Sequence, residues 1–428
     1  MAEVNSSLPR STSLPSLTNP ISAKYSFRKM IGKGAYGTVW VARNRETNEE
    51  VAIKKIGARN FENVMWAKRA LRELKLLRHL HGNDNITSFI DAEANSADPQ
   101  DFSELYLVEG LMEADLAQII KSKQRLTDEH HQYFIYQILR GLKWMHSAGI
   151  VHRDLKPGNV LVNSHCELRI CDFGLARGQP EKNAHLVQTE YVATRYYRAP
   201  EVILSPRHYG KALDLWSVGC IFGELLLGRV MFKGQDYVDQ LKIIFEVLGT
   251  PPDLESMGLC SPKVLRLLAS WRKWTKIPLE KIFPKNANPG GLDLIDRLLT
   301  FSPTERITAQ EALTHPYLEA YHLEEDEPVH PKQFDFAFEW ADDISSIKEL
   351  IIEELRAIKA EQKNKVQIDN SKKTDHEREK LLSPRQTSHP PQLPAQQPED
   401  NAAEDPAITE VHQAGSIEEE LADLHIAA

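Results

Sequence analysis

Three polar side chains that suit a metal ion lie close together in the middle of the chain. Asp154 and Asn159 precede a short apolar run at 160–162, and Asp172 follows a second run at 168–171. Two such runs predict a β-hairpin, which brings its two ends side by side, so the three side chains should meet. Carboxylate and amide oxygens suit Mg²⁺, which also takes phosphate oxygens of a substrate. The sequence therefore predicts a magnesium site that a phosphate-bearing substrate completes.

A glycine-rich segment near the N-terminus could cover those phosphates. Gly32, Gly34 and Gly37 form a G-x-G-x-x-G pattern, and the lack of side chains lets a backbone approach a ligand closely. Dinucleotide-binding enzymes share the pattern, but in them a helix follows the glycines and an acidic residue stands about 20 positions on. Here a second β-type run follows, and Lys54 ends the sequence V-A-I-K. The segment therefore argues against a dinucleotide-dependent oxidoreductase.

The order of these motifs resembles that of eukaryotic protein kinases. H-R-D-x-K-x-x-N at 152–159 and D-F-G at 172–174 match the catalytic and metal-binding loops, and V-A-I-K matches the lysine strand. Two unrelated polar turns beside a buried hairpin are the alternative. That alternative explains one motif well, but it does not explain both in this order at this separation.

The kinase resemblance implies a role for each polar residue of the site. Asp154 would accept the proton of the substrate hydroxyl, Lys156 would steady the γ-phosphate, and Asn159 and Asp172 would hold Mg²⁺. Lys54 would bind the α- and β-phosphates of ATP. Glu73 would pair with Lys54 from a helix that the spacing of apolar residues at 71, 74 and 77 predicts.

The resemblance also implies the remaining contacts of ATP. The hinge after the strand at 105–108 would offer the Gly110 carbonyl and the Met112 N–H to adenine, although relatives often carry an acid at the position of Gly110. Asp115 would bind the ribose. The full predicted set is Ile31, Gly32, Lys33, Gly34, Ala35, Tyr36, Gly37, Thr38, Val39, Ala52, Lys54, Gly110, Met112, Asp115 and Leu161.

Thr189-Glu190-Tyr191 lies between D-F-G and the sequence A-P-E at 199–201. This T-E-Y segment resembles the activation lip of mitogen-activated protein kinases, and neighbouring motifs make the fungal cell-wall-integrity branch the most similar. The resemblance implies that an upstream dual-specificity MAP kinase kinase phosphorylates Thr189 and Tyr191. Each phosphate brings close to two negative charges, which arginines bind through charge-assisted hydrogen bonds. The implied arginines are Arg72, Arg153 and Arg177 for Thr189, and Arg195 and Arg198 for Tyr191.

An acidic segment follows the predicted catalytic domain. Glu324, Glu325, Asp326 and Glu327 resemble the common docking site of this family, which receives basic docking peptides of activators, phosphatases and substrates. Leu323 departs from the family, which usually carries an aspartate there. A solvated acidic loop without a docking role is the alternative. The family further implies a monomer of the cytoplasm and nucleus that phosphorylates Ser or Thr followed by Pro.

Composition sets limits on the protein class. Residues 386–428 hold nine acidic residues and no Lys or Arg, so the rest of this chain of net charge −9 is neutral. We therefore expect no nucleic-acid binding. No apolar run approaches the about 20 residues of a membrane span, and residues 1–17 lack the apolar core of a secretory signal. The four cysteines show no C-x-x-C pairing, which favours reduced thiols.

The resemblance to protein kinases implies a bilobal α+β fold, with a small β-rich lobe and a larger helical lobe. We expect residues 1–24 to form a leader without fixed structure and residues 25–318 to form the kinase domain. Its N-lobe would span 25–110 and its C-lobe 111–318. An extension at 319–360 would carry the docking segment, and the acidic, Pro- and Gln-rich residues 361–428 would lack fixed structure.

Some packing contacts are also predicted. By resemblance, Glu201 should pair with Arg306, and Asp214 should brace the backbone of the catalytic loop. Three phenylalanines at 334, 336 and 338 should pack on the small lobe, and 346–360 should form an amphipathic helix.

A scaffold that keeps the kinase fold but not its chemistry, a pseudokinase that binds partners through the acidic segment, is the rival hypothesis from another class. The complete set of Lys54, Glu73, Asp154, Asn159 and Asp172 favours the enzyme, because a scaffold need not keep it. The sequence therefore predicts an ATP- and Mg²⁺-dependent protein serine/threonine kinase.

Overall fold

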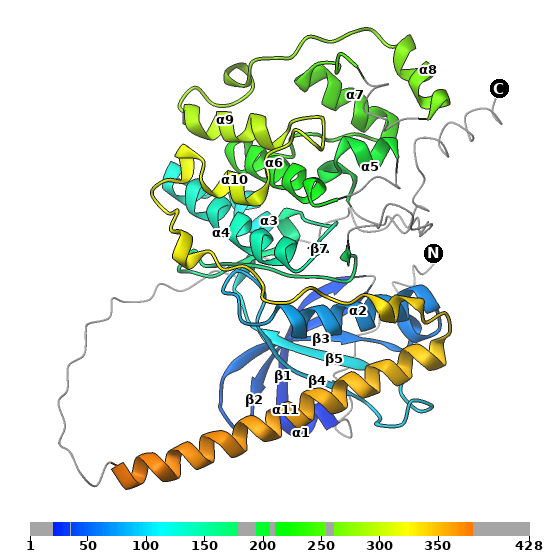
Figure 1. The fold of residues 1–428 in the computed structure, drawn as a ribbon, viewed down its shortest axis with the longest axis vertical. Coiled ribbons are helices and arrows are strands. Elements are labelled where there is room, and N and C mark those ends of the chain that lie inside the picture. The colour runs from blue at the N-terminus through cyan, green and yellow to red at the C-terminus, as the bar shows by residue number, and fades with distance from the viewer. Residues whose placement is uncertain (1–19, 35, 179–193, 206–209, 254–260, 380–428) are drawn as a thin grey trace, which may run out of the picture.

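The computed structural model describes residues 20–34, 36–178, 194–205, 210–253 and 261–379, with the backbone alone for 365–379. Figure 1 shows a small lobe built on a β-sheet and a larger lobe of helices, joined where β5 leaves the sheet. The predicted α+β class with two unequal lobes is confirmed.

An antiparallel sheet of five strands, in the order β1-β2-β3-β5-β4, forms the small lobe. The strands are β1 (Tyr25–Gly34), β2 (Gly37–Asn44), β3 (Glu50–Ile56), β4 (Phe89–Ala94) and β5 (Leu105–Gly110). Successive side chains of a strand point to opposite faces. In β3 this alternation buries Val51 and Ile53 in a small outer core and leaves Ala52 and Lys54 for the opposite face. Glu109 lies opposite Ala52 in the ladder between β3 and β5 and so shares that inner face.

A short helix, α1 (Pro20–Lys24), closes the outer core of the sheet. Its Ile21 is fully buried against Tyr25, Val51 and Ile53. The prediction that residues 1–24 lack fixed structure is therefore wrong for 20–24, because one apolar side chain in a polar segment seals this core. The preceding residues of the leader lie outside the described part of the chain.

The predicted helix that carries Glu73 is α2 (Val64–Leu80). Asn63 caps its start, since the side-chain oxygen accepts from the backbone N–H groups of Met65 and Trp66. Leu71, Leu74 and Leu77 are buried at the expected spacing. In Figure 1, α2 lies between the sheet and the C-terminal extension, so both sides of the helix are covered by protein.

Helices dominate the large lobe. They are α3 (Leu116–Lys121), α4 (Asp128–Ser147), α5 (Pro200–Leu204), α6 (Ala212–Leu227), α7 (Tyr237–Leu248), α8 (Pro262–Ser270), α9 (Pro289–Leu298) and α10 (Ala309–Leu313). The core of this lobe surrounds α6, whose Trp216 and Phe222 are fully buried. The predicted pair of Glu201 and Arg306 is confirmed, with two hydrogen bonds of 2.7 and 2.9 Å.

Short strands beside the helices carry the loops of the site. They are β6 (Ala114–Asp115), β7 (Ile150–Val151), β8 (Val160–Val162), β9 (Leu168–Ile170) and β10 (Arg177–Gly178). The predicted hairpin is confirmed, since Val160 pairs with Ile170 in an antiparallel ladder. The strand β7 pairs with β10, which fixes Arg177 opposite Val151.

The C-terminal extension returns to the small lobe and ends in the long helix α11 (Ile344–Glu379). Figure 1 shows α11 crossing the small lobe beside α2 and β4. The predicted amphipathic helix is confirmed, with Ile347, Ile351 and Leu355 buried. The prediction of no fixed structure from residue 361 is wrong for 361–379, where the helix continues; the acidic tail beyond lies outside the described residues.

The predicted packing on the small lobe is confirmed for two of the three phenylalanines, because Phe334 contacts the ring of His79 at the end of α2 and Phe338 lies beneath Lys75. Phe336 packs between the other two rings and Gly178. Cys166, Cys171 and Cys220 are free thiols, and Cys260 is not among the described residues. Within the described ranges, no helix has both the length and the apolarity that a membrane span requires.

Candidate active site

The hairpin of β8 and β9 brings the three predicted metal and base residues together. The amide nitrogen of Asn159 donates to the Asp154 carboxylate at 3.0 Å and to the Asp154 carbonyl at 2.8 Å. The backbone N–H of Cys171 donates to the Asn159 carbonyl at 3.0 Å, which places Asp172 beside this loop. The structure thus brings Asp154, Asn159 and Asp172 to one edge of the hairpin, as the sequence predicts.

Two residues of these loops adopt a backbone conformation that non-glycine residues rarely take. Arg153 has φ of +71° and Asp172 has φ of +64°. Such conformations cost about 1–3 kcal/mol and persist only where surrounding contacts impose them. At Arg153 the contact is Asp214, whose two carboxylate oxygens accept from the backbone N–H groups of His152 and Arg153, each at 2.9 Å. The predicted bracing by Asp214 is confirmed.

Asp214 is itself held by His146 of α4, whose Nε2 lies 2.8 Å from its carboxylate. Burial alone would raise the pKa of Asp214, but the bonds from His146 and from the catalytic-loop backbone outweigh it and hold the pKa below its usual value. The ionised carboxylate therefore fixes the loop that presents Asp154.

Lys54 joins the sheet to the helix and to the metal-binding loop. Its Nζ lies 2.5 Å from Glu73 Oε1 and 3.4 Å from Asp172 Oδ1. Burial lowers the pKa of Lys54, but the carboxylates of Asp172 and Glu73 outweigh it, so the net shift is upward. For Asp172, Lys54 and Lys156 overcome burial and lower the pKa. Burial raises the pKa of Glu73 to about 7, although Lys54 beside it acts in the opposite direction. The predicted contact between Lys54 and Glu73 is formed.

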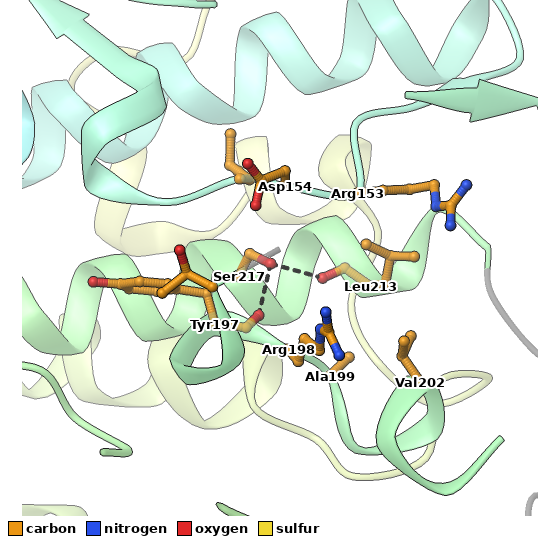
Figure 2. A pocket seen from close by; sticks show the side chains of 10 residues that line it. Arg153, Asp154, Tyr197, Arg198, Ala199, Val202, Leu213 and Ser217 are labelled. Carbon is orange, nitrogen blue, oxygen red and sulfur yellow. Dashed lines mark hydrogen bonds between the residues drawn. The ribbon is translucent and has the colours of Figure 1, made fainter. Parts of the chain in front are cut away.

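Asp154 lies at the edge of a pocket between the catalytic loop and α5–α6. Figure 2 shows Asp154 and Arg153 on one side and Tyr197, Arg198 and Ser217 on the other. Ser217 Oγ bonds to the carbonyls of Tyr197 and Leu213, which ties the residues before A-P-E to α6. The remaining lining residues are Leu155, Thr194, Ala199 and Val202. Lys156 Nζ donates to Asp154 Oδ2 at 2.9 Å.

The glycine loop spans the end of β1 and the start of β2, where Gly34 pairs with Gly37. Gly37 has φ of +153°, and a Cβ there would lie 2.2 Å from the Lys55 carbonyl, so only glycine fits. Ile31, Gly32, Lys33 and Thr38 belong to these strands, and Val39 lies opposite Lys54. The predicted contact Ala35 lies outside the described residues.

The side chain of Tyr36, another predicted ATP contact, lies against α2. Its ring packs on Trp66 with centroids 4.8 Å apart, and its hydroxyl accepts from Arg69. The side chain thus links the glycine loop to the helix that carries Glu73.

The space beside Gly110 at the hinge explains why this position carries a glycine. A Cβ at Gly110 would lie 2.3 Å from Ser88 Oγ, and Ser88 in turn accepts a hydrogen bond from Arg169 at 2.8 Å. The serine and arginine thus occupy the space that an acidic side chain would need. Of the other predicted nucleotide contacts, Asp115 lies opposite Leu161 in the ladder between β6 and β8, and Met112 lies in the link before it. Asp115 also caps α3 by accepting from Gln118.

The donor set near the hairpin fits Mg²⁺ with a bound nucleotide. Both side-chain bonds of Asn159 use its amide nitrogen, which leaves the oxygen for a cation. Within the described residues no cluster of three or more His, Cys, Asp or Glu side chains is arranged to hold a metal. One amide and one carboxylate are an incomplete set that phosphate oxygens and water complete for Mg²⁺.

Two of the three arginines predicted for phosphothreonine converge on one carboxylate. Arg72, fully buried in α2, makes two bonds to Glu339, and Arg177 Nη1 lies 4.0 Å from the same side chain. Arg153 lies two residues after β7, the strand that pairs with the strand of Arg177, β10. The predicted phosphotyrosine pair, Arg195 and Arg198, stacks on Tyr237. Thr189 and Tyr191 themselves lie outside the described residues.

The acidic segment is only partly exposed. Glu324, Glu325 and Asp326 form an exposed 3₁₀ turn after Leu323, which is half exposed. The prediction that Glu327 belongs to the docking surface is wrong, because its side chain is 1% exposed. The Glu327 carboxylate accepts from Lys143 at 3.3 Å and lies 2.7 Å from His322. These partners stabilise the carboxylate in its buried position.

Sequence reasoning missed two carboxylates near the site. Glu109 lies on the inner face of β5 as its second-last residue, and its carboxylate accepts from Thr87 at 2.8 Å. Burial raises the pKa of Glu109 despite the nearby Lys54. The position of Glu109 directly after the apolar run at 105–108 could have indicated from the sequence that it lies near the site. Glu339 follows Phe338 in the extension, and nothing in the sequence indicated that it contacts Arg72.

Comparison with known proteins agrees with this geometry. A protein kinase domain model matches residues 25–318. The mitogen-activated protein kinase mpkA of Aspergillus fumigatus is 53% identical over 338 residues, which are 78% of this chain and 78% of the relative. The chain belongs to the mitogen-activated protein kinases. The relatives SLT2/MPK1 of Saccharomyces cerevisiae and spm1 of Schizosaccharomyces pombe are 49% and 50% identical, and each alignment covers 78% of this chain and 70% or 79% of the relative.

The predicted resemblance to fungal members of this family is confirmed, and so is the prediction of a protein serine/threonine kinase. Nothing favours the pseudokinase hypothesis. This kinase belongs to a family that uses ATP, generally with Mg²⁺, and whose members have upstream kinases, phosphatases and substrates as partners.

Proposed function

We propose that this kinase transfers the γ-phosphate of ATP to Ser or Thr followed by Pro, and that phosphates on Thr189 and Tyr191 switch it on. The observation that carries the proposal is the position of Asp154. Its carboxylate faces the pocket before A-P-E while Lys156 and Asn159 hold one of its oxygens.

Asp154 is prepared to receive the substrate hydroxyl. Lys156 and Asn159 both bond to Oδ2, so Oδ1 remains to accept the hydroxyl proton of Ser or Thr. Asp154 thereby orients the hydroxyl oxygen towards the γ-phosphate. Partial burial lowers the pKa of Lys156, but Asp154 beside it outweighs burial and the net shift is upward. The partly exposed ammonium of Lys156 would neutralise charge on the transferring group.

The other residues position the nucleotide. Lys54 would hold the α- and β-phosphates, and Glu73 fixes Lys54. The backbone of the glycine loop would cover the phosphates. Asn159 and Asp172 would hold Mg²⁺, which would neutralise negative charge on the phosphates. Positioning and electrostatic stabilisation supply most of the catalysis in reactions of this type.

The activation proposal is supported by the arginines. Arg72 connects α2 to the metal-binding loop, and Arg177 follows that loop, so a phosphate bound by both would stabilise the two elements together. Arg195 and Arg198 lie beside Tyr237 near the pocket, which supports a role in reading a phosphate on Tyr191 and in shaping the subsite for proline.

The partners we propose are a dual-specificity MAP kinase kinase, together with phosphatases and protein substrates that carry basic docking peptides. The exposed charges of Glu324, Glu325 and Asp326 support docking of such peptides, with Leu323 as an apolar neighbour. We further propose that the kinase works as a monomer in the cytoplasm and nucleus.

The test compares peptides and lip variants. The wild-type kinase, phosphorylated by a dual-specificity kinase, should phosphorylate a Ser-Pro peptide and should act poorly on the matched Ser-Ala peptide. The variant Thr189→Ala/Tyr191→Phe, treated identically, should show only basal activity. Equal rates on both peptides would contradict the proline subsite, and equal activity of wild type and lip variant would contradict the switch.

A further inference from the structure

A carboxylate of the C-terminal extension is inserted beside the helix that carries Glu73. Glu339 Oε1 accepts from Arg72 Nε at 2.5 Å and Oε2 accepts from Arg72 Nη2 at 2.8 Å. Such a two-point contact between a guanidinium and a carboxylate is both strong and geometrically specific. Arg72 is 0% exposed, so water does not solvate its guanidinium, and the contact with Glu339 holds the guanidinium in place.

The third contact of Arg72 is with the metal-binding loop of the candidate active site. Arg72 Nη1 donates to the Gly174 carbonyl at 2.5 Å, and Gly174 is the glycine of D-F-G, two residues after Asp172. Arg72 is also the neighbour of Glu73 in α2. A guanidinium fixed by Glu339 therefore ties the helix of the ion pair to the loop that carries the predicted metal ligand.

The surroundings of Glu339 are basic. Arg177 lies 4.0 Å away, and Lys68 donates to the Glu339 carbonyl at 2.9 Å. Burial raises the pKa of Glu339, but Arg72 and Arg177 outweigh it and the net shift is downward. An ionised carboxylate thus offsets the repulsion between two arginines that the activation lip is expected to engage.

We propose that Glu339 is a positioning residue that holds Arg72, and through it α2 and the D-F-G loop, in the arrangement in which Lys54 pairs with Glu73 before the lip is phosphorylated. The inference rests on the proposed activation by phosphate on Thr189. In the unphosphorylated kinase, Glu339 supplies the negative charge for the arginines. After phosphorylation, the phosphate supplies further negative charge, so the kinase depends less on Glu339.

Other contacts of the extension with α2 have a different geometry. Lys75 and Arg78 pair with Glu354, and Lys68 pairs with Asp342, whose side chain is 91% exposed. These contacts anchor the extension to the helix, and none of these three ion pairs includes a residue of the D-F-G loop. Asp342 therefore offers a matched control, a nearby carboxylate on a basic residue of the same helix.

The experiment compares wild type, Glu339→Gln and the control Asp342→Asn, each in the unphosphorylated and the doubly phosphorylated state. Unphosphorylated Glu339→Gln should lose about tenfold or more in kcat/KM, the worth of a charge-assisted contact, and its KM for ATP should rise. The phosphorylated variant should stay within about threefold of wild type, since phosphate replaces the lost charge. Asp342→Asn should match wild type in both states.

Two further readouts separate positioning from general stability. Amide hydrogen exchange in α2 should quicken in unphosphorylated Glu339→Gln and return to the wild-type rate on phosphorylation. Glu339→Asp, which keeps the charge, should recover part of the lost activity and serves if the glutamine variant folds poorly.

The outcomes distinguish this inference from the proposed function. An equal fold-loss in both phosphorylation states would show a purely structural role and overturn the inference, as would unchanged or increased activity of the unphosphorylated variant. A wild-type kinase that does not respond to lip phosphorylation would instead overturn the proposed function, and the inference with it.

Discussion

Lys54 and Glu73 meet at 2.5 Å across the interface between β3 and α2. The side chain of Lys54 is 14% exposed and that of Glu73 is 6% exposed, so little water screens the pair. This contact requires α2 to lie close to the sheet, and the position of the helix thus determines whether the nucleotide lysine is held.

Removing one partner of this pair should therefore weaken nucleotide binding. We expect Glu73→Gln to lower kcat/KM by about 10- to 100-fold, the range for a lost charge-assisted bond, mainly through a higher KM for ATP. Steady-state kinetics at several ATP concentrations measure the effect. Glu62→Gln, an exposed change just before the same helix, is the control, and an unchanged KM for ATP in Glu73→Gln would contradict the role of the pair.

The buried pair of Glu201 and Arg306 should matter for stability rather than chemistry. Their side chains are 2% and 0% exposed, and removing one partner leaves a buried charge alone. Arg306→Ala should lower the free energy of unfolding by about 3–5 kcal/mol. By comparison, Arg297→Ala breaks an exposed pair and should cost less than about 1 kcal/mol. Urea denaturation of both variants measures the difference, and similar losses would refute the distinction.

Asp214 should make stability depend on acid pH. Its pKa is held below the usual value of 3.8 in the folded protein, because the bonds from His146 and the loop backbone outweigh burial. A carboxylate of this kind stabilises the fold above its unfolded pKa, and the contribution is lost as the pH falls through its folded pKa. The difference in unfolding free energy between wild type and Asp214→Asn should therefore be constant from neutral pH down to about pH 5 and shrink below about pH 4. A difference that grows on acidification would be inconsistent with this assignment.

Gly110 and Ser88 should behave as a coupled pair. A methyl group at Gly110 would lie 2.3 Å from Ser88 Oγ, so Gly110→Ala should cost about 1–3 kcal/mol through overpacking. Adding Ser88→Ala removes the hydroxyl and leaves the nearest serine atom, Cβ, at 3.7 Å. The double variant should then be more stable than Gly110→Ala alone, by thermal unfolding. No recovery would show that the steric conflict lies elsewhere.

Local motifs were sufficient to predict the catalytic residues. Asp154, Asn159 and Asp172 flank one hairpin, so their spacing along the chain predicted that they meet. The pairing of Lys54 with Glu73 was predicted from the resemblance to protein kinases.

Contacts between distant segments were not predictable in this way. Ile21 seals the outer core from a polar leader, and Glu339 contacts Arg72 across 267 positions of sequence. Glu327 looks like its exposed neighbours in the sequence, but a turn directs it towards Lys143 and His322. In each case the contact depends on one side chain and not on a repeated spacing, so no periodic pattern indicates it.

The most direct test of the account concerns Asp154. Wild type and Asp154→Asn, both doubly phosphorylated, should be compared for phosphate transfer to a Ser-Pro peptide at saturating ATP. The proposed role as base predicts a fall in kcat of about 10²- to 10⁴-fold with little change in the KM for ATP. A variant that transfers phosphate as fast as wild type would contradict the assignment of this residue and the mechanism built on it.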